Sequence, residues 1–199
     1  MRFLLWLSLA ALALAAPALI EPGRGVGPVG PATVRADLDR LGLPEGQLMD
    51  GEDSTEVWAL ERERRYVVSW VQGKAARVLI RGERSVYSTA EGVTLGTPLS
   101  RLEALNQGPL RFRSFEGESA GRVTDWEGGR LQGWRGRLEL TLSWKTPTYG
   151  GLSGPEKERL EQPGLLLRSS DPLCGRLDPI VEAMEVILGS GAAPGPSPR

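Results

Sequence analysis

Two stretches of the chain align without gaps at an offset of 64 residues, and this internal repeat limits the fold to two similar units in tandem. The aligned positions pair Thr33 with Thr97, Leu38 with Leu102, Leu41 with Leu105, Trp70 with Trp134 and Val78 with Leu142. Identities are few, but residues of the same kind recur at the same places. We therefore expect each half to form the same order of secondary-structure elements.

Each half begins with a pattern typical of a short helix. Thr33 and Thr97 are N-cap candidates, because a threonine hydroxyl can accept a hydrogen bond from a free amide of the first turn. Pro98 fits the first helical position. Apolar residues recur at helical spacing, namely Val34, Leu38 and Leu41 in the first half and Leu99, Leu102 and Leu105 in the second. Gly42 and Asn106 are residues that tolerate the left-handed conformation ending a helix.

After each helix the apolar spacing changes to two, which predicts β-strands. The clearest alternation places Trp134, Leu138, Leu140, Leu142 and Trp144 on one face and Arg135, Arg137, Glu139, Thr141 and Ser143 on the other. In the first half, residues 75–81 alternate in the same way, 66–71 are apolar on both faces, and 56–60 are a candidate partner strand. With turn signals at 72–74 and 127–129, each half predicts a helix followed by a three-stranded antiparallel meander, an α+β fold.

The N-terminal segment has the layout of a secretory signal peptide. Arg2 gives a positive start, residues 3–15 are apolar except for Ser8, and Ala16-Pro17-Ala18 offers the small residues that a signal peptidase reads. We expect cleavage after Ala18, which would make the mature protein secreted or periplasmic. The alternative is an uncleaved membrane anchor, since residues 3–20 are just long enough to span a bilayer.

These patterns divide the chain into five expected parts. They are a signal peptide over 1–18, a linker over 19–28, a first module over 29–91, a second module with a closing segment over 92–188, and a disordered tail over 189–199. The tail has almost nothing to bury. Within the second module we expect a loop over 149–154, one or two helical turns over 155–162, and a closing strand over 181–188, with a helix there as the alternative.

The composition excludes several chemistries. The chain has no histidine and a single cysteine, Cys174, so it cannot form a histidine-based catalytic triad, a histidine-ligated metal site or an intramolecular disulfide. The formal net charge is −1 and the arginines are scattered, which argues against nucleic-acid binding. The acidic stretch 50–53 lacks the spacing of a calcium loop, and the glycine-rich run 23–27 lacks the context of a phosphate loop. We expect no metal and no cofactor.

Four residues are candidates for binding a partner. Tryptophan is enriched at binding hot spots, and Trp126 is the best candidate for exposure because it lies beside a turn. The core is expected to hold Trp70, Trp134 and Trp144, which fall on apolar strand positions. The polar face of the strand over 134–144 supplies the other candidates, Arg135, Arg137 and Lys145. Plain solvation of that face is the alternative interpretation. The flanks of Cys174 suggest ordinary packing.

The openings of the two halves, over 29–44 and 93–109, share a glycine-rich approach, a threonine, a short helix and Leu-Gly or Leu-Asn before the strands. This pattern resembles the small α+β module of the SmpA/OmlA (BamE-like) envelope proteins and the tandem module of β-lactamase inhibitory proteins. Residues 122–131 also resemble a recurring feature of uncharacterised secreted bacterial proteins. Over 26–188, the resemblance implies one continuous antiparallel sheet with helices on one face and the other face open to a partner.

The chain departs from the BamE-like pattern in two ways. It lacks the lipid-anchoring cysteine and the usual Gly-Met-Thr at the helix start, which puts a role in outer-membrane assembly in doubt. No contact residue of the inhibitory proteins carries over to a position here.

Together these observations predict a secreted or periplasmic, non-catalytic binding module for an envelope or extracellular protein, with membrane contact only if the signal segment stays uncleaved. Two alternatives remain. One is a structural envelope protein without a discrete partner. The other is a glycan-acting enzyme that uses paired carboxylates, which needs no histidine. No carboxylate pair lies in an apolar setting that would raise one pKa, so we assign no catalytic residue.

Overall fold

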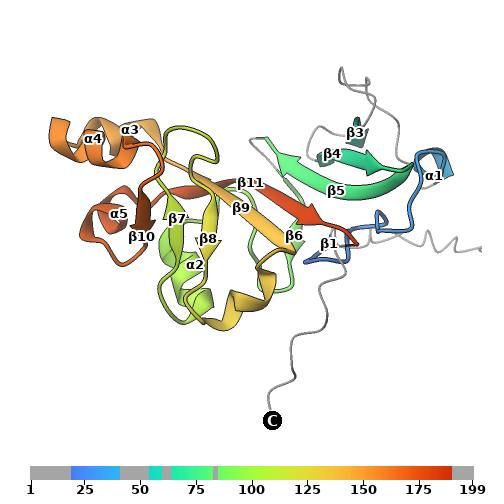
Figure 1. The fold of residues 1–199 in the computed structure, drawn as a ribbon, viewed down its shortest axis with the longest axis horizontal. Coiled ribbons are helices and arrows are strands. Elements are labelled where there is room, and N and C mark those ends of the chain that lie inside the picture. Colours follow the sequence, from blue (N-terminus) through green and yellow to red (C-terminus); the bar gives the residue numbers. More distant parts are fainter. Residues whose placement is uncertain (1–18, 41–53, 60–63, 83–84, 190–199) are drawn as a thin grey trace, which may run out of the picture.

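The structure of the protein is a computed structural model, which describes residues 19–40, 54–59, 64–82 and 85–189. It has an α+β fold, in which short helices pack with antiparallel sheets (Figure 1). The expected signal peptide over 1–18, the acidic stretch 50–53 and nearly all of the expected tail lie outside the described residues.

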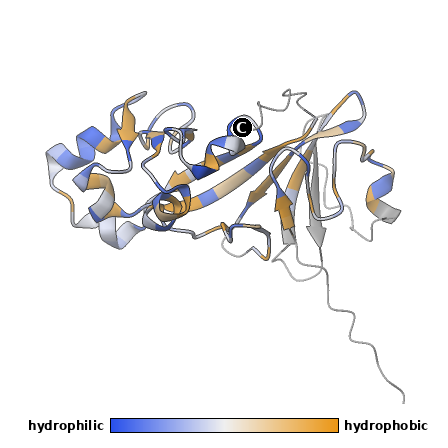
Figure 2. Ribbon diagram, turned by 90° about the horizontal axis from the view of Figure 1, so that it is seen from below, coloured by the Kyte–Doolittle hydropathy of each residue, from blue (hydrophilic) through white to orange (hydrophobic). Residues whose placement is uncertain are grey.

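The largest sheet has five strands in the order β3-β4-β5-β11-β9. Its strands are β3 (Ser54–Ala59), β4 (Arg64–Val71), β5 (Lys74–Arg81), β9 (Leu138–Ser143) and β11 (Ile180–Ile187). The first-half meander β3-β4-β5 and the closing strand β11 confirm the predictions for those segments. Hydrophilic and hydrophobic residues alternate along the long central strands (Figure 2), so one face of the sheet carries the core.

Strands β5 and β11 lie side by side in this sheet and have equivalent neighbours. Each of these strands pairs antiparallel with a partner, β4 for β5 and β9 for β11. Both pairs contain a β-bulge at the corresponding place, one beside Trp70 of β4 and one beside Val181 of β11. Bulges are local irregularities that a fold retains for a structural reason. The alignment of Val78 with Leu142 of β9 is therefore corrected: β11, and not β9, takes the role that β5 has in the first half.

The two repeated threonines close identical turns and do not cap helices, which corrects the N-cap prediction. The Thr33 hydroxyl accepts a hydrogen bond from the Gly30 N–H at 3.0 Å, and the Thr97 hydroxyl accepts one from the Thr94 N–H at 2.9 Å. The carbonyl of Thr33 then accepts a hydrogen bond from the N–H of Ala75, at the start of β5. The carbonyl of Thr97 accepts one from the N–H of Val181, at the start of β11. Each turn ties the start of its half to the strand at the centre of the sheet.

The helices that follow are short. Helix α1 (Asp37–Arg40) begins later than expected, and Val34 is exposed before it because the Val34 N–H bonds the Asp37 carboxylate at 3.0 Å. Helix α2 (Leu99–Asn106) agrees with the prediction, with its apolar side packed into the core. The left-handed residue at its end is Gln107, with φ 58°, and not Asn106 as expected.

The second half departs from the expected meander. Strands β7 (Arg111–Arg113) and β8 (Val123–Asp125) join β10 (Leu166–Arg168) in a separate sheet of order β10-β7-β8. Trp134 ends the 3-10 helix η1 (Arg130–Trp134) instead of starting a strand. Gly136, with φ 70°, turns the chain after η1, and β9 begins only at Leu138.

An insertion between β9 and β11 distinguishes the second half from the first. It contains α3 (Thr146–Gly150), α4 (Gly154–Glu161), β10 and α5 (Pro172–Leu177). Helix α4 confirms the helical prediction over 155–162, whereas α3 occupies part of the segment expected as a loop. A capping box between Ser153 and Glu156 begins α4. The insertion places α3 and α4 at the end of the molecule farthest from α1 (Figure 1).

Residues 19–28 are part of the fold, which corrects the prediction of an extended linker. Strand β1 (Leu19–Glu21) pairs with β2 (Gly25–Val26) and with β6 (Ser88–Thr89) in a small sheet. Ile20 and Val26 are fully buried, so this hairpin contributes to the core. The sequence reading missed it because the glycines between the apolar residues suggested a chain without regular structure. Among the described helices, none is long and apolar enough to cross a membrane.

Asn106 is the polar centre of the second half. Its amide nitrogen donates to the carbonyls of Gly108, Pro109 and Trp126 at 2.9–3.0 Å, and its amide oxygen accepts from the Leu131 N–H at 3.1 Å. The side chain is fully buried, and these bonds join α2 to the turn before η1. A Cβ at Gly129 would lie 2.3 Å from the Asn106 amide, so the close approach requires glycine there.

We expect Asn106→Ala to lower the free energy of unfolding by about 3 kcal/mol, because it leaves buried backbone groups without partners. The measurement is chemical denaturation followed by tryptophan fluorescence. Arg101→Ala, on the exposed side of the same helix, is the matched control and should change stability by less than about 0.5 kcal/mol. Equal stability of the two variants would contradict the role assigned to Asn106.

Candidate binding surface

No described element packs on the second face of the five-stranded sheet over β5, β11 and β9. Its side chains alternate with the core residues of the same strands and are partly or well exposed; they are Arg77, Leu79, Arg81, Glu139, Thr141, Ser143, Ala183, Glu185 and Ile187. Toward β4 this face closes, since Val67 is buried. β9 has the predicted polar side, on which Glu139, Thr141 and Ser143 are partly exposed.

The face continues onto the smaller sheet. An isolated bridge pairs Arg122, just before β8, with Thr141 of β9, and cross-strand partners share a face. In the register of β7 and β10, Arg113 is the cross-strand partner of Leu166 and Arg111 that of Arg168, and these four side chains lie on the same face. Phe112 and Leu167, between them, point into the core. We call the open side of both sheets together the open face.

Cross-strand ion pairs join the strands of the open face. Arg77 of β5 contacts Glu185 of β11 at 3.1 Å, and Arg122 contacts Glu139 of β9 at 3.2 Å. Pairs that remain this exposed contribute at most about 1 kcal/mol each. At the acidic end of the Arg122–Glu139 pair, the Glu139 Oε2 atom is buried.

Three charged side chains gather where the open face meets the turn after β8. Glu127 accepts hydrogen bonds from Arg111 Nε at 2.6 Å and from Arg168 Nη2 at 2.7 Å. The hydrogen bonds from Arg168, and then those from Arg111, hold the pKa of the Glu127 carboxyl below its usual value. The side chains of Arg111 and Arg168 are 52% and 54% exposed, so their remaining N–H groups face solvent.

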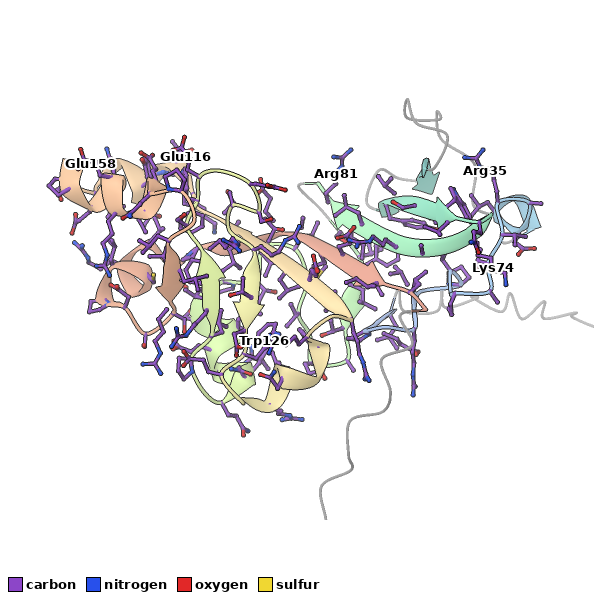
Figure 3. All side chains as sticks on the ribbon, in the orientation of Figure 1. Arg35, Lys74, Arg81, Glu116, Trp126 and Glu158 are labelled. Carbon is purple, nitrogen blue, oxygen red and sulfur yellow. The ribbon has the colours of Figure 1, made fainter. Side chains whose placement is uncertain are left out.

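The structure buries Trp126, which corrects the prediction that it is the best exposed candidate. Trp126 is 3% exposed and packs edge-to-face on Trp134 at 5.6 Å between ring centroids. The turn beside it brings Glu127 and Gly128 to the surface while the indole points inward, and Figure 3 shows Trp126 inside the fold near η1. Trp70 and Trp134 are buried as predicted.

The three charged candidates are not brought together. Arg135 is exposed after η1 and contacts Asp125 at 3.5 Å. Arg137 is half-buried; its side chain packs beside Gly23, and its carbonyl accepts the Gly23 and Ile187 amides. Lys145 is exposed beyond the other end of β9, eight residues from Arg137, which is roughly 26 Å along a fully extended strand. Arg135 and Arg137 precede β9, so neither belongs to its polar face as expected.

An aromatic cluster lies near Lys145, and its members contact one another. Trp144, expected in the core, is partly buried and stacks on Tyr149 at 4.6 Å between centroids. Lys157 covers the Tyr149 ring at 5.1 Å, and the Tyr149 hydroxyl bonds the Glu161 carboxylate. That hydrogen bond is the largest cause that raises the pKa of Tyr149 to about 12. Because neighbours already occupy the Tyr149 ring, the cluster fastens α3 and α4 to the end of β9 and offers no free platform for a sugar ring.

Comparison with known proteins identifies no family. No family model matches the chain, and no curated protein matches it. Among solved structures, the chain is similar to the crystal structure of the uncharacterized protein YfeY from Escherichia coli, with 17% identity, a TM-score of 0.41, and coverage of 83% of this chain and 97% of that chain. A likeness of this degree carries no argument about function. The resemblance to BamE-like and inhibitory-protein modules stays a prediction.

The sequence alone did not indicate Arg111 and Arg168 as candidate site residues. Glu127 lies inside the segment 122–131 that the reading singled out, but its partners are far from it in sequence and adjacent only through the β10-β7-β8 register. No group of three or more acidic or cysteine side chains in the described part of the chain is placed to hold a metal ion.

Cys174 is fully buried in α5, as its flanking residues suggested, and burial raises the pKa of its thiol to about 12. We expect the native protein to react with a thiol reagent at pH 8 more than a hundredfold more slowly than the denatured chain. In the native protein the Cys174 thiol is mostly protonated, and the reagent cannot reach it. Stopped-flow absorbance with an aromatic disulfide reagent measures this. Rapid modification of the native protein would contradict the buried assignment.

Glu127 makes a pH-dependent contribution to stability. Its pKa is lowered in the folded state, so the contribution is present above the unfolded pKa and is lost as the pH falls through the folded value. We expect Glu127→Gln to lower the melting temperature at pH 7. In a series of melting curves at decreasing pH, the melting temperatures of the variant and the wild type should become equal at the most acidic pH. Glu118→Gln, in an exposed loop, is the matched control. A pH-independent difference would contradict the ion-pair explanation.

Proposed function

We propose that the protein is a non-catalytic binding module that engages an envelope or extracellular protein through its open face. One observation carries this proposal: among the described residues, one side of the two linked sheets presents partly exposed polar and apolar side chains while the other side carries the core.

The composition of the open face also favours a protein partner. Leu79, Ala183 and Ile187 lie among ion-paired residues, and this mixture of apolar and charged groups is typical of a non-obligate interface. The proposed location, secreted or periplasmic, rests on the signal-peptide pattern over 1–18. The BamE-like resemblance supports an envelope role without identifying the partner.

The glycan-acting alternative receives less support. Among the described carboxyl groups that show a shifted pKa, Glu127 and Glu156 are both shifted downward, by arginine and backbone hydrogen bonds. A general acid needs the opposite shift. Trp144 and Tyr149, the aromatic pair nearest the surface, are occupied by each other and by Lys157.

The test is affinity capture of the tagged protein after cross-linking in its native cells, read by quantitative mass spectrometry. Thr141→Arg introduces a long charged side chain in the middle of the open face and should reduce recovery of the specific partner at least tenfold. Thr148→Arg makes the same change on α3, outside that face, and should leave recovery unchanged. Thermal denaturation of both variants confirms that they fold.

Loss of the partner in both variants, or in neither, would contradict binding through the open face. Recovery of no specific protein by the wild type would contradict the protein-binding function itself, and would favour a structural role.

A further inference from the structure

One part of the open face carries an uncompensated positive charge. Around the smaller sheet, the arginines are Arg111, Arg113, Arg122 and Arg168, and the acidic residues that contact them are Glu127 and Glu139. Arginine is the side chain best suited to bind carboxylate groups with paired hydrogen bonds. We call the surface formed by Arg111, Arg113, Leu166 and Arg168 the basic end of the open face.

Arg113 is the residue that leaves the charge unbalanced. It lies on β7, beside Leu166 of β10 in the register, and is half-buried. Among the described residues, its guanidinium group has no ion-pair or hydrogen-bond partner. All of its donors are therefore available to bind an arriving carboxylate with paired hydrogen bonds.

Arg111 and Arg168 are held in place for a second contact. The Glu127 carboxylate accepts hydrogen bonds from Nε of both arginines and from Nη2 of Arg168, and these bonds fix the orientation of each guanidinium group. Both Nη groups of Arg111 and Nη1 of Arg168 remain as donors toward solvent. Fixed donors lose little conformational freedom when a ligand binds. The ion pair with Glu127 therefore orients these arginines without using all of their donors.

The edge of the smaller sheet fits an extended chain. β10 is an outer strand in the order β10-β7-β8, and Leu166 is 50% exposed. Hydrogen bonds from Ser114 to Leu165 and from Ser169 to Leu110 show which residues face β7. By the alternation of an antiparallel pair, the backbone N–H and C=O of Leu166 point away from it. Unpaired backbone groups on an open strand edge can pair with another extended chain.

We propose that the basic end binds an acidic, extended segment of the protein partner, whose carboxylates contact Arg113 and the Arg111–Arg168 pair while its backbone pairs with Leu166. This rests on the proposed function and assigns the chemistry of the partner. A protein segment is favoured over a nucleic acid or an anionic membrane because the arginines here are interspersed with glutamates and the formal net charge of the chain is −1. Binding to polyanions is driven by many cations gathered on one surface.

The first test is titration of the protein with a fluorescent peptide of alternating glutamate and valine, read by anisotropy. Arg113→Gln and Arg168→Gln should each weaken binding about tenfold, because each removes a charged hydrogen bond. Arg101→Gln, an exposed arginine on α2, is the matched control and should bind as the wild type does. The same peptide with glutamine in place of glutamate should not bind.

Three results would overturn the inference. They are no binding of the acidic peptide, equal binding by the Arg113 and control variants, and tighter binding to single-stranded DNA or to phosphatidylglycerol vesicles than to the peptide. The two proposals fail separately. If the cellular partner is lost with Thr141→Arg but kept with Arg113→Gln and Arg168→Gln, the binding function stands and the basic end is not its site. If no partner is captured at all, the binding function fails.

Discussion

The pairing of β5 with β11 is the interaction on which the rest of the structure depends. It joins the last strand of the first-half meander to the last strand of the second half, with Val78 opposite Val186 and Ile80 opposite Met184, all fully buried. β4 and β9 extend the sheet outward from this pair, and the turns at Thr33 and Thr97 attach the opening of each half to it. Without this pair, the two halves would no longer share one sheet, and their apolar side chains would lack a common core.

The sequence predicted the elements whose signal is local. Alternation over 75–81 and 138–143, the helix over 99–106 and the burial of Trp70 and Trp134 follow from the spacing of apolar residues, which acts within a few positions. The α+β class follows from the order of these elements. The repeat was also detectable, because both halves retain a threonine at the same turn.

What the sequence could not predict depends on contacts between distant segments. The alternation that appeared to begin at Trp134 is interrupted because Gly136 adopts a left-handed conformation and Asn106 holds the turn before η1 in place. The β1 hairpin has too few apolar residues to be detected alone, yet Ile20 and Val26 are buried by partners elsewhere in the chain. Trp126 is next to a surface turn, and the direction of its side chain is set by Trp134. The site residues Arg111 and Arg168 become neighbours only through strand register.

The position of β11 has a consequence for how the protein is made. This strand follows every other strand in sequence, yet it lies between β5 and β9 in the sheet. A chain still emerging from the ribosome therefore lacks the strand that joins its two halves, and its largest sheet cannot close until synthesis has passed Ile187. Folds dominated by contacts between distant segments assemble slowly. The joining of the two halves is therefore a late step, which can begin only after both halves have been synthesised.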